Sequence, residues 1–240
     1  MKILLINPNT SGPMTESIGA AARAVAAPGT TVLAVHPSFG PASLEGHFDE
    51  AIGAAGVAEQ VRLQPPHDAV VIACFGDPGL DAARELTPAP VLGIAEAAFH
   101  AASMLATGFS VVTTLTRTCV IAERLVQRYG FERSCRGIHG TDIPVLDLEQ
   151  GGEALVARIE AVARRALERD RSGAIVLGCA GMATLTAALQ ARLGVPVIDG
   201  VAVAVKFAEA LAALGLGTSK QGDYAAPLAK PWLGWARALA

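Results

Sequence analysis

The sequence predicts an α/β fold of two lobes related by a pseudo-twofold axis, each lobe a parallel sheet flanked by helices. Three observations predict it. Short apolar runs alternate with helical stretches along the chain. Several of these runs are apolar without alternation, as strands covered on both faces are. Two cysteine-bearing segments, residues 70–76 (VVIACFG) and 174–181 (AIVLGCAG), also occupy matching places in the two halves.

The repeat extends beyond these two segments. Cys74 and Cys179 lie 105 positions apart, and the Pro-Val steps that open the following strands, at Pro90 and Pro196, lie 106 apart. The first strand of each half also runs into a polar loop, NPNTS at 7–11 and TTLTRT at 113–118. Because parallel sheets bind ligands at the carboxyl ends of their strands, we expect four loops to meet in one crevice.

Periodicity and breaker residues place the individual elements. The first half is expected to hold strands at 3–7, 31–36, 69–73 and 91–94, with helices at 13–26, 48–63, 79–86 and 96–106. The second half is expected to hold strands at 109–113, 135–139, 174–178 and 197–199, with helices at 117–129, 152–169, 182–192 and 201–214. The glycine- and proline-containing remainder predicts an irregular arm that ends in a short helix.

Composition narrows the possible partners. The chain has 240 residues, 52% hydrophobic and 17% charged, and a formal net charge of −3, which offers no basic surface for nucleic acid. No apolar run reaches the length of a membrane span. Residues 1–6 run directly into NPN, too early for a secretory signal, so we expect a cytoplasmic protein with reduced thiols. No metal is expected, because the four cysteines show no zinc spacing and the five histidines are scattered.

The two matched cysteines are the strongest candidates for chemistry. A single cysteine at such a place is more often a core residue, but two in register at strand ends favour a function. Each precedes a helical pattern, whose N-terminus is expected to lower the thiol pKa. Two thiols on opposite sides of one carbon can remove and return a proton, as a racemase requires. Cys119 and Cys135 are expected to be structural, one in a helix and one in or near a strand.

The neighbouring residues indicate a neutral substrate. Apart from Asp77, which the following proline marks as the N-cap of the helix at 79–86, the two cysteine loops carry no charge. Backbone N–H groups beside Gly76 and Gly181 are expected to hold a carbonyl oxygen that gains enolate charge. The remaining polar groups are the side chains of Asn7, Asn9, Thr10, Thr113 and Thr114, which suit a cyclic ureide; Arg117 or Glu16 could also reach in.

Four segments together resemble the aspartate/glutamate/hydantoin racemase superfamily, and within it the hydantoin and allantoin racemases. They are INPNTS at 6–11 with Met14-Thr15, GPASLEG at 40–46 with Asp49-Glu50, CFGDPGL at 74–80 and GCAGM at 178–182. The resemblance covers nearly the whole chain. It implies an Asp/Glu racemase-like fold in which residues 1–96 plus 207–240 form the first lobe and residues 97–206 the second.

The same resemblance implies the site and its requirements. Cys74 and Cys179 are the expected acid and base, and no metal, nucleotide or pyridoxal cofactor is expected. The resemblance implies that Asn7, Phe75, Gly76, Thr114, Ala180 and Gly181 line the pocket, where Thr113 is also expected as one of the polar groups named above. The expected partners are a small neutral cyclic ureide and further copies of the chain in a homo-oligomer, with no nucleic acid and no membrane.

Departures from the superfamily pattern refine this expectation. Its amino-acid racemases resemble this chain less, because they carry an acidic residue where Asn7 stands and polar steps where Phe75-Gly76 and Ala180-Gly181 stand. The related arylmalonate decarboxylases keep only the second cysteine, so Cys74 counts against decarboxylation.

Our hypothesis is therefore a cofactor-independent racemase that inverts C5 of 5-substituted hydantoins by two-cysteine 1,1-proton transfer. The alternatives are a maleate-type cis–trans isomerase, another enzyme of this superfamily, and a non-catalytic small-molecule binding protein. A maleate-type enzyme would need clamps for two carboxylates. The sequence leaves open the preferred C5 substituent, the oligomeric number and the cysteine that is the resting thiolate. Phe39 and Phe48 are candidates to cover an apolar substituent.

Overall fold

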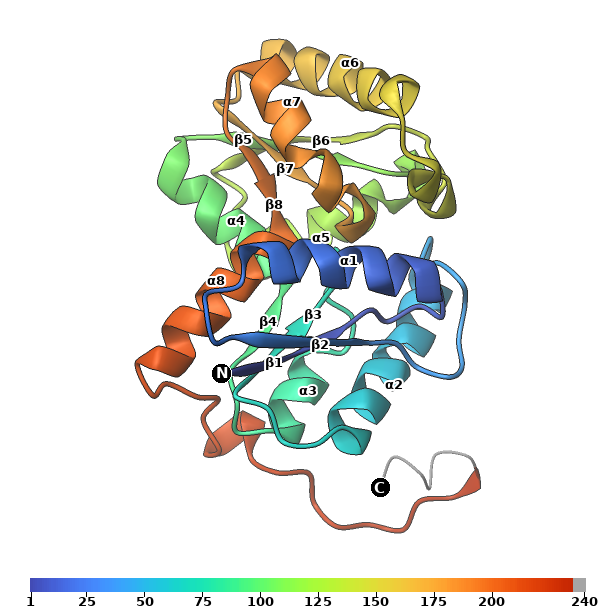
Figure 1. Ribbon diagram of the computed structural model, residues 1–240, viewed down its shortest axis with the longest axis vertical. Coiled ribbons are helices and arrows are strands. Elements are labelled where there is room, and N and C mark those ends of the chain that lie inside the picture. The colour runs from blue at the N-terminus through green and yellow to red at the C-terminus, as the bar shows by residue number, and fades with distance from the viewer. Residues whose placement is uncertain (235–240) are drawn as a thin grey trace.

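The computed structural model describes residues 1–234 and shows two parallel four-stranded sheets, stacked as two lobes (Figure 1). The strands of the first sheet are β1 (Lys2–Ile6), β2 (Thr31–Val35), β3 (Ala69–Ile72) and β4 (Val91–Gly93). The strands of the second sheet are β5 (Phe109–Thr113), β6 (Cys135–Gly140), β7 (Ala174–Leu177) and β8 (Val197–Asp199). The expected α/β class and pseudo-twofold pair of parallel sheets are therefore confirmed.

The two sheets have the same topology, β2-β1-β3-β4 in one and β6-β5-β7-β8 in the other. In each lobe the two central strands are the first and third in chain order, β1 with β3 and β5 with β7. Their residues are fully buried hydrophobic side chains almost throughout, as expected of strands covered on both faces. This topology brings the loops after β1, β3, β5 and β7 to the carboxyl ends of the sheets.

Helices cover both sheets and occur where the sequence predicts them. The α-helices are α1 (Gly12–Val25), α2 (His47–Leu63), α3 (Leu80–Leu86), α4 (Ile94–Leu105), α5 (Cys119–Tyr129), α6 (Glu153–Asp170), α7 (Thr186–Leu193) and α8 (Gly200–Ala213). Short 3₁₀ turns precede two of them, at Thr116–Thr118 and Ala180–Leu185. Cys119 begins α5 and Cys135 begins β6, as expected.

Two segments differ from the sequence expectation. A 3₁₀ turn at Val145–Gln150 was not predicted, and it lies over the carboxyl end of the second sheet, with Val145 and Leu148 buried. The predicted C-terminal arm contains a 3₁₀ turn at Gly222–Tyr224 and then continues as exposed irregular chain to residue 234. The short helix predicted at its end lies outside the described residues. Within residues 1–234, no helix combines the length and apolar character needed to cross a bilayer.

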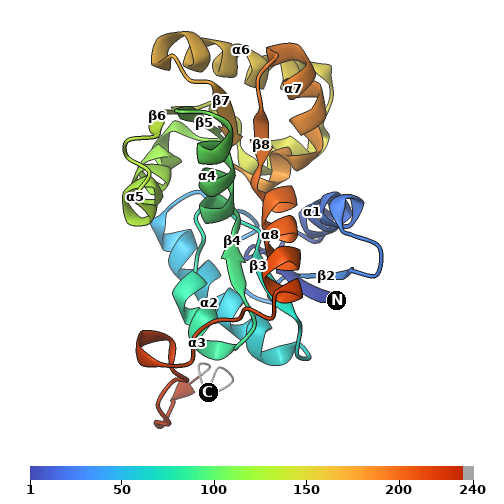
Figure 2. The same ribbon diagram turned by 90° about the vertical axis from the view of Figure 1, so that its left-hand side faces the viewer.

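Two helices are exchanged between the lobes (Figure 2). Helix α4 follows β4 of the first sheet but packs on β7 and β8, and α8 follows β8 but packs on β3 and β4. The two helices also pack on each other, and a Cβ at Gly200 would collide with the Ile94 carbonyl where they begin. The boundaries predicted at 96/97 and 206/207 fall inside these helices, so that division of the chain stays a prediction.

Phenylalanines on α4 and β5 join the lobes through a shared core. Phe99 of α4 is fully buried, stacks on Phe109 of β5 at 5.5 Å between ring centroids, and meets Phe75 of the first lobe edge-to-face at 5.6 Å. Such contacts add about 0.5–1.5 kcal/mol each beyond area burial. The loop that carries Cys74 is thereby attached to the second lobe through Phe75.

Asp77 is a helix cap, but of a different helix from the one predicted. The N-cap of α3 is Gly79, whose φ of 73° suits glycine. Asp77 instead accepts hydrogen bonds from the backbone N–H groups of Ala95 and Glu96 in α4, both at 3.0 Å, and from the Tyr129 hydroxyl at 2.8 Å. Its carboxylate approaches so closely that only glycine fits at position 93. Asp77 thus joins the Cys74 loop, α4 and α5.

Replacing Asp77 by Ala should leave two backbone N–H groups and one hydroxyl without their acceptor. We expect the free energy of unfolding to fall by about 2–3 kcal/mol, measured by urea denaturation at pH 7. Asp223→Ala, at an exposed position in the 222–224 turn, is the matched control and should change stability by less than about 0.5 kcal/mol. Equally small changes in both variants would contradict this role of Asp77.

Candidate active site

One cavity between the lobes brings together all nine site residues predicted from the sequence. Cys74, Phe75 and Gly76 come from the loop after β3, and Cys179, Ala180 and Gly181 come from the matching loop after β7. Asn7 follows β1, and Thr113 and Thr114 end β5. Residues not in that prediction complete the lining: Asn9, Met14, Leu44, Glu50, Ala73, Thr118, Ile121, Ala122, Val145 and Gly178.

Strand β3 and its buried neighbours fix the position of Cys74. The strand residues up to Ile72 are buried and pair with β1 and β4, and Ala73 donates its N–H to the Ile6 carbonyl at 2.8 Å. Cys74 is the first residue past this pairing and is partly exposed to the cavity. The pKa of its thiol is raised to about 12, mainly by burial, with smaller contributions from negative charge at Cys179, Glu50 and Asp77.

Cys179 occupies the equivalent place after β7. Gly178 donates its N–H to the Val112 carbonyl at 2.8 Å, and the next residue, Cys179, reaches the cavity. Burial raises the pKa of this thiol to about 11, with a smaller contribution from the charge of Glu45. The expected lowering of both pKa values by helix N-termini is therefore wrong. Helix α3 begins only at Leu80, and burial outweighs the N–H groups beside the sulfurs.

The backbone N–H groups of Gly76 and Gly181 lie against the sulfur two residues earlier in each loop. Each lowers the pKa of its cysteine and so favours the thiolate, though less than burial opposes it. The same arrangement in both loops continues the pseudo-twofold repeat into the site. These two N–H groups were expected to hold a substrate oxygen. That expectation stays a prediction.

The two asparagines of the NPN loop form a fixed polar wall. Asn7 is 1% exposed and donates from Nδ2 to Asn9 Oδ1 at 2.8 Å and to Thr15 Oγ1 at 2.9 Å. Asn9 Oδ1 also accepts the Ser11 N–H at 2.9 Å. These bonds fix the orientation of both amides. Asn7 therefore has two roles: it lines the cavity, and its hydrogen bond orients the side chain of Asn9.

The threonines on the opposite lobe differ in what their hydroxyls do. Thr113 donates its hydroxyl to the Gly178 carbonyl at 2.9 Å, which holds β5 against the Cys179 loop. Within residues 1–234 the Thr114 hydroxyl makes no hydrogen bond, although the residue is only 4% exposed and lines the cavity. It is thus free to bind a ligand. Thr10, Glu16 and Arg117 were considered from the sequence and do not line this cavity.

Sequence reasoning missed the residues that close the cavity. Leu44 and Glu50 come from the loop before α2 and from its first turn, and Thr118, Ile121 and Val145 come from the second lobe. Phe39 and Phe48 are not among the lining residues, and Phe48 is 79% exposed. The motif that contains Leu44 and Glu50 was visible in the sequence, but which of its side chains turn inward was not.

Two hydrogen bonds join the lobes beside the cavity. Glu45 Oε1 accepts the Val145 N–H at 2.9 Å, and Ser11 donates its hydroxyl to Glu149 at 2.8 Å. Both partners in the second lobe belong to the unpredicted 3₁₀ turn at Val145–Gln150. The first bond holds the loop at 37–46 against the second lobe, and the second bond does the same for the loop at 7–11, so together they shape the cavity.

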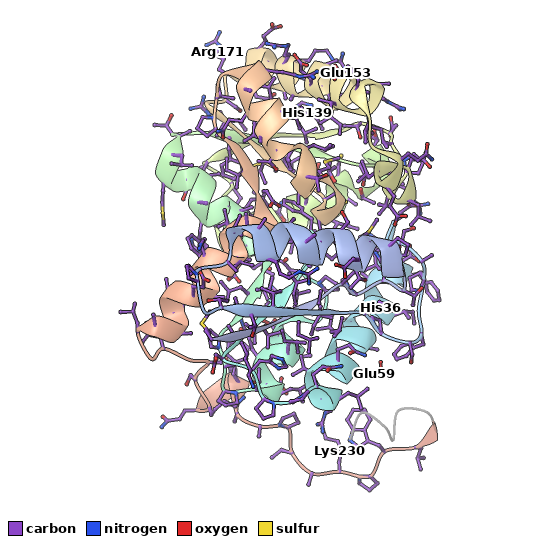
Figure 3. All side chains as sticks on the ribbon, viewed as in Figure 1. His36, Glu59, His139, Glu153, Arg171 and Lys230 are labelled. Atoms are coloured by element: carbon purple, nitrogen blue, oxygen red, sulfur yellow. The ribbon has the colours of Figure 1, made fainter. Side chains whose placement is uncertain are left out.

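Two of the histidines and the other two cysteines lie apart from this cavity. His36 and His139 lie in different lobes (Figure 3), and no described residues gather into a cluster of three potential metal ligands. The sulfurs of Cys119 and Cys135 are directed at the carbonyls of Leu115 and Gly137, at 3.9 Å and 3.7 Å. Neither residue lines the cavity.

The sequence matches known proteins along nearly its full length. The family model for the Asp/Glu/hydantoin racemases matches residues 3–208. A hydantoin racemase from Pseudomonas sp. (strain NS671) is 48% identical over 236 residues, which are 98% of this chain and 95% of that protein.

Solved structures agree with that match. The allantoin racemase from Klebsiella pneumoniae is 58% identical and superposes with a TM-score of 0.97, covering 100% of this chain and 98% of its own. The allantoin racemase from Pseudomonas fluorescens is 41% identical with a TM-score of 0.95, covering 98% of this chain and all of its own. The expected resemblance and the expected class, an isomerase of the racemase type, are confirmed. The chain belongs to the Asp/Glu/hydantoin racemase family.

Proposed function

We propose that this protein racemises 5-substituted hydantoins, allantoin among them, by moving one proton at C5 between Cys74 and Cys179. The C4 carbonyl of such a ring acidifies the C5 hydrogen. One cysteine, as thiolate, removes this hydrogen, and the other, as thiol, protonates the planar enolate from the opposite face. No cofactor takes part, and either enantiomer is a substrate because the two halves of the site exchange roles.

One observation carries this proposal: two thiols from equivalent strand ends line the same cavity and interact. Both cysteines line this cavity, and a thiolate at Cys179 would raise the pKa of Cys74. We infer that the sulfurs approach the cavity from opposite sides, because the loops after β3 and β7 occupy equivalent places in two lobes of the same topology. A carbon held between them has one sulfur on each face.

The high pKa of both thiols fits a demanding proton abstraction. With pKa values of about 12 and 11, both cysteines are protonated at neutral pH, and the active form with one thiolate is a minor species. Such a thiolate is a strong base. Mutual repulsion prevents both sulfurs from ionising together, so a thiol remains available as the acid.

The other groups of the cavity favour a neutral ring over a dicarboxylate. The lining residues, all within the described part of the chain, include the carboxylate of Glu50 and no lysine or arginine. A maleate-type substrate would bring two further negative charges with no cation to balance them. A cyclic ureide brings N–H donors and C=O acceptors, which the amides, Thr114 and Glu50 can match.

Four further expectations belong to the same proposal. The protein works without a metal or organic cofactor, acts in the cytoplasm, forms a homo-oligomer, and divides into lobes near 96/97 and 206/207. The sulfur pair supplies both acid and base, which is all that a 1,1-proton transfer requires.

Replacing Cys74 or Cys179 by Ser should each lower the racemisation rate at least about 10²-fold, because either change removes one of the two proton carriers. The measurement is the loss of optical rotation of enantiopure 5-benzylhydantoin and of enantiopure allantoin, corrected for spontaneous racemisation. Cys119→Ser is the matched control outside the cavity and should keep the wild-type rate. Normal rates in both active-site variants would refute the two-thiol mechanism.

Activity should rise with pH through the neutral range. The base must be a thiolate whose pKa is about 11 or higher, so kcat/KM should increase about tenfold per pH unit between pH 7 and 9. An N3-methylated 5-benzylhydantoin removes the ionisation of the substrate from the profile. A plateau already reached at pH 7–8 would mean that the base has an ordinary or lowered pKa.

A further inference from the structure

Glu50 is a charged group of the cavity that the proton transfer itself does not use. It lies in the first turn of α2, and 23% of its side chain is exposed. Its carboxylate lies against Gly76, two residues after Cys74 in the same cavity wall, and its negative charge contributes to the raised pKa of Cys74. A carboxylate at this place makes the Cys74 thiolate harder to form. We therefore expect Glu50 to have another role in the cavity, one that offsets this effect.

The two carboxylate oxygens of Glu50 differ in their partners. Oε2 lies 3.3 Å from Nδ1 of His47. Oε1 lies beside Gly76, where any side chain would collide with it, and among residues 1–234 it receives no hydrogen bond. Burial raises the pKa of Glu50, which shows that the partners present do not replace the lost water. Oε1 is therefore an acceptor facing the cavity without a donor.

We propose that Glu50 Oε1 accepts a hydrogen bond from the ring N1–H of the hydantoin, an inference that rests on the racemase function proposed above. N1 is bonded to C5, the carbon that must lie between the sulfurs, and Glu50 lies beside one of those sulfurs. On the other side of C5 is the C4 carbonyl, whose oxygen gains negative charge in the enolate. A carboxylate would repel that oxygen, so Glu50 faces the N1 side of the ring.

This assignment orients the ring in the cavity. With N1–H on Glu50, the C4 oxygen points away from the carboxylate, toward donors such as the free hydroxyl of Thr114. The same contact selects substrates with an N–H next to the reacting carbon and rejects those with a carboxylate there. Glu50 is thus a specificity-determining residue that contacts the substrate.

The test compares two substrates that differ only at N1. Both compounds carry a methyl group on N3, so that neither ionises there. In N3-methyl-5-benzyl-oxazolidine-2,4-dione a ring oxygen replaces N1–H, so it has the shape of N3-methyl-5-benzylhydantoin but offers Glu50 lone pairs instead of a donor. For the wild type and Glu50→Gln, kcat/KM is measured for the hydantoin, and the dione is measured as a substrate and as a competitive inhibitor. The readout is the preference for the hydantoin. It is the ratio of kcat/KM for the hydantoin to kcat/KM for the dione or, where the dione is not turned over, the ratio of the inhibition constant of the dione to the KM of the hydantoin. Any effect of the Glu50 charge on Cys74 acts on both compounds and cancels.

We expect the wild type to favour the hydantoin by at least about tenfold and Glu50→Gln to reduce that preference to within about threefold. Glu50→Ala, which adds no new polar group, must give the same loss of preference and covers the case in which the Gln variant folds poorly. Glu59→Gln is the matched control, on the same helix but outside the cavity (Figure 3), and should keep the wild-type ratio.

An unchanged ratio in Glu50→Gln or Glu50→Ala, with the wild type active on hydantoin, would overturn the contact with N1–H while leaving the racemase function intact. A wild type that racemises neither 5-benzylhydantoin nor allantoin would instead overturn the proposed function, and this inference with it.

Discussion

The candidate active site depends on one constraint: two cysteine sulfurs lie at the carboxyl ends of two equivalent buried strands. Parallel strands β3 and β7 stop at the same depth of their sheets, and each delivers a cysteine to the space between the lobes. The exchange of α4 and α8 fixes that space, because each helix begins on one sheet and packs on the other. Asp77 ties the start of α4 directly to the loop of Cys74.

Burial and chemistry act together at this site. Removing water from the two thiols raises their pKa values to about 12 and 11, so that under the proposed mechanism the reacting thiolate is scarce but strongly basic. The N–H groups of Gly76 and Gly181 each lower the pKa of their own cysteine and so offset part of this effect of burial. Glu50 makes the two sides of the cavity different, since among the described residues no matching carboxylate from the second lobe lines it. A site with symmetric acid and base can still hold its substrate in one orientation when the surrounding groups differ.

Much of this arrangement could be predicted from the sequence because it follows from local patterns. Buried strands show as uninterrupted apolar runs, and the repeat around Cys74 and Cys179 places both residues at strand ends. Asp77 shows the limit of such reasoning. Asp-Pro is a local signal for capping the next helix in the sequence, but in the folded chain the Asp77 carboxylate accepts hydrogen bonds from the N-terminus of α4 instead. Leu44 and Val145 were missed for the same reason, since contacts between the lobes, not local sequence, turn their loops toward the cavity.

The most direct test of the account follows proton exchange at C5 in D₂O by NMR, with each enantiomer of 5-benzylhydantoin and each single variant, Cys74→Ser and Cys179→Ser. Sulfurs on opposite faces predict that each variant exchanges the C5 proton of only one enantiomer, and that the two variants choose opposite ones. Exchange of the same enantiomer by both variants, or of both enantiomers by either, would contradict the claim that the two thiols face one carbon from opposite sides.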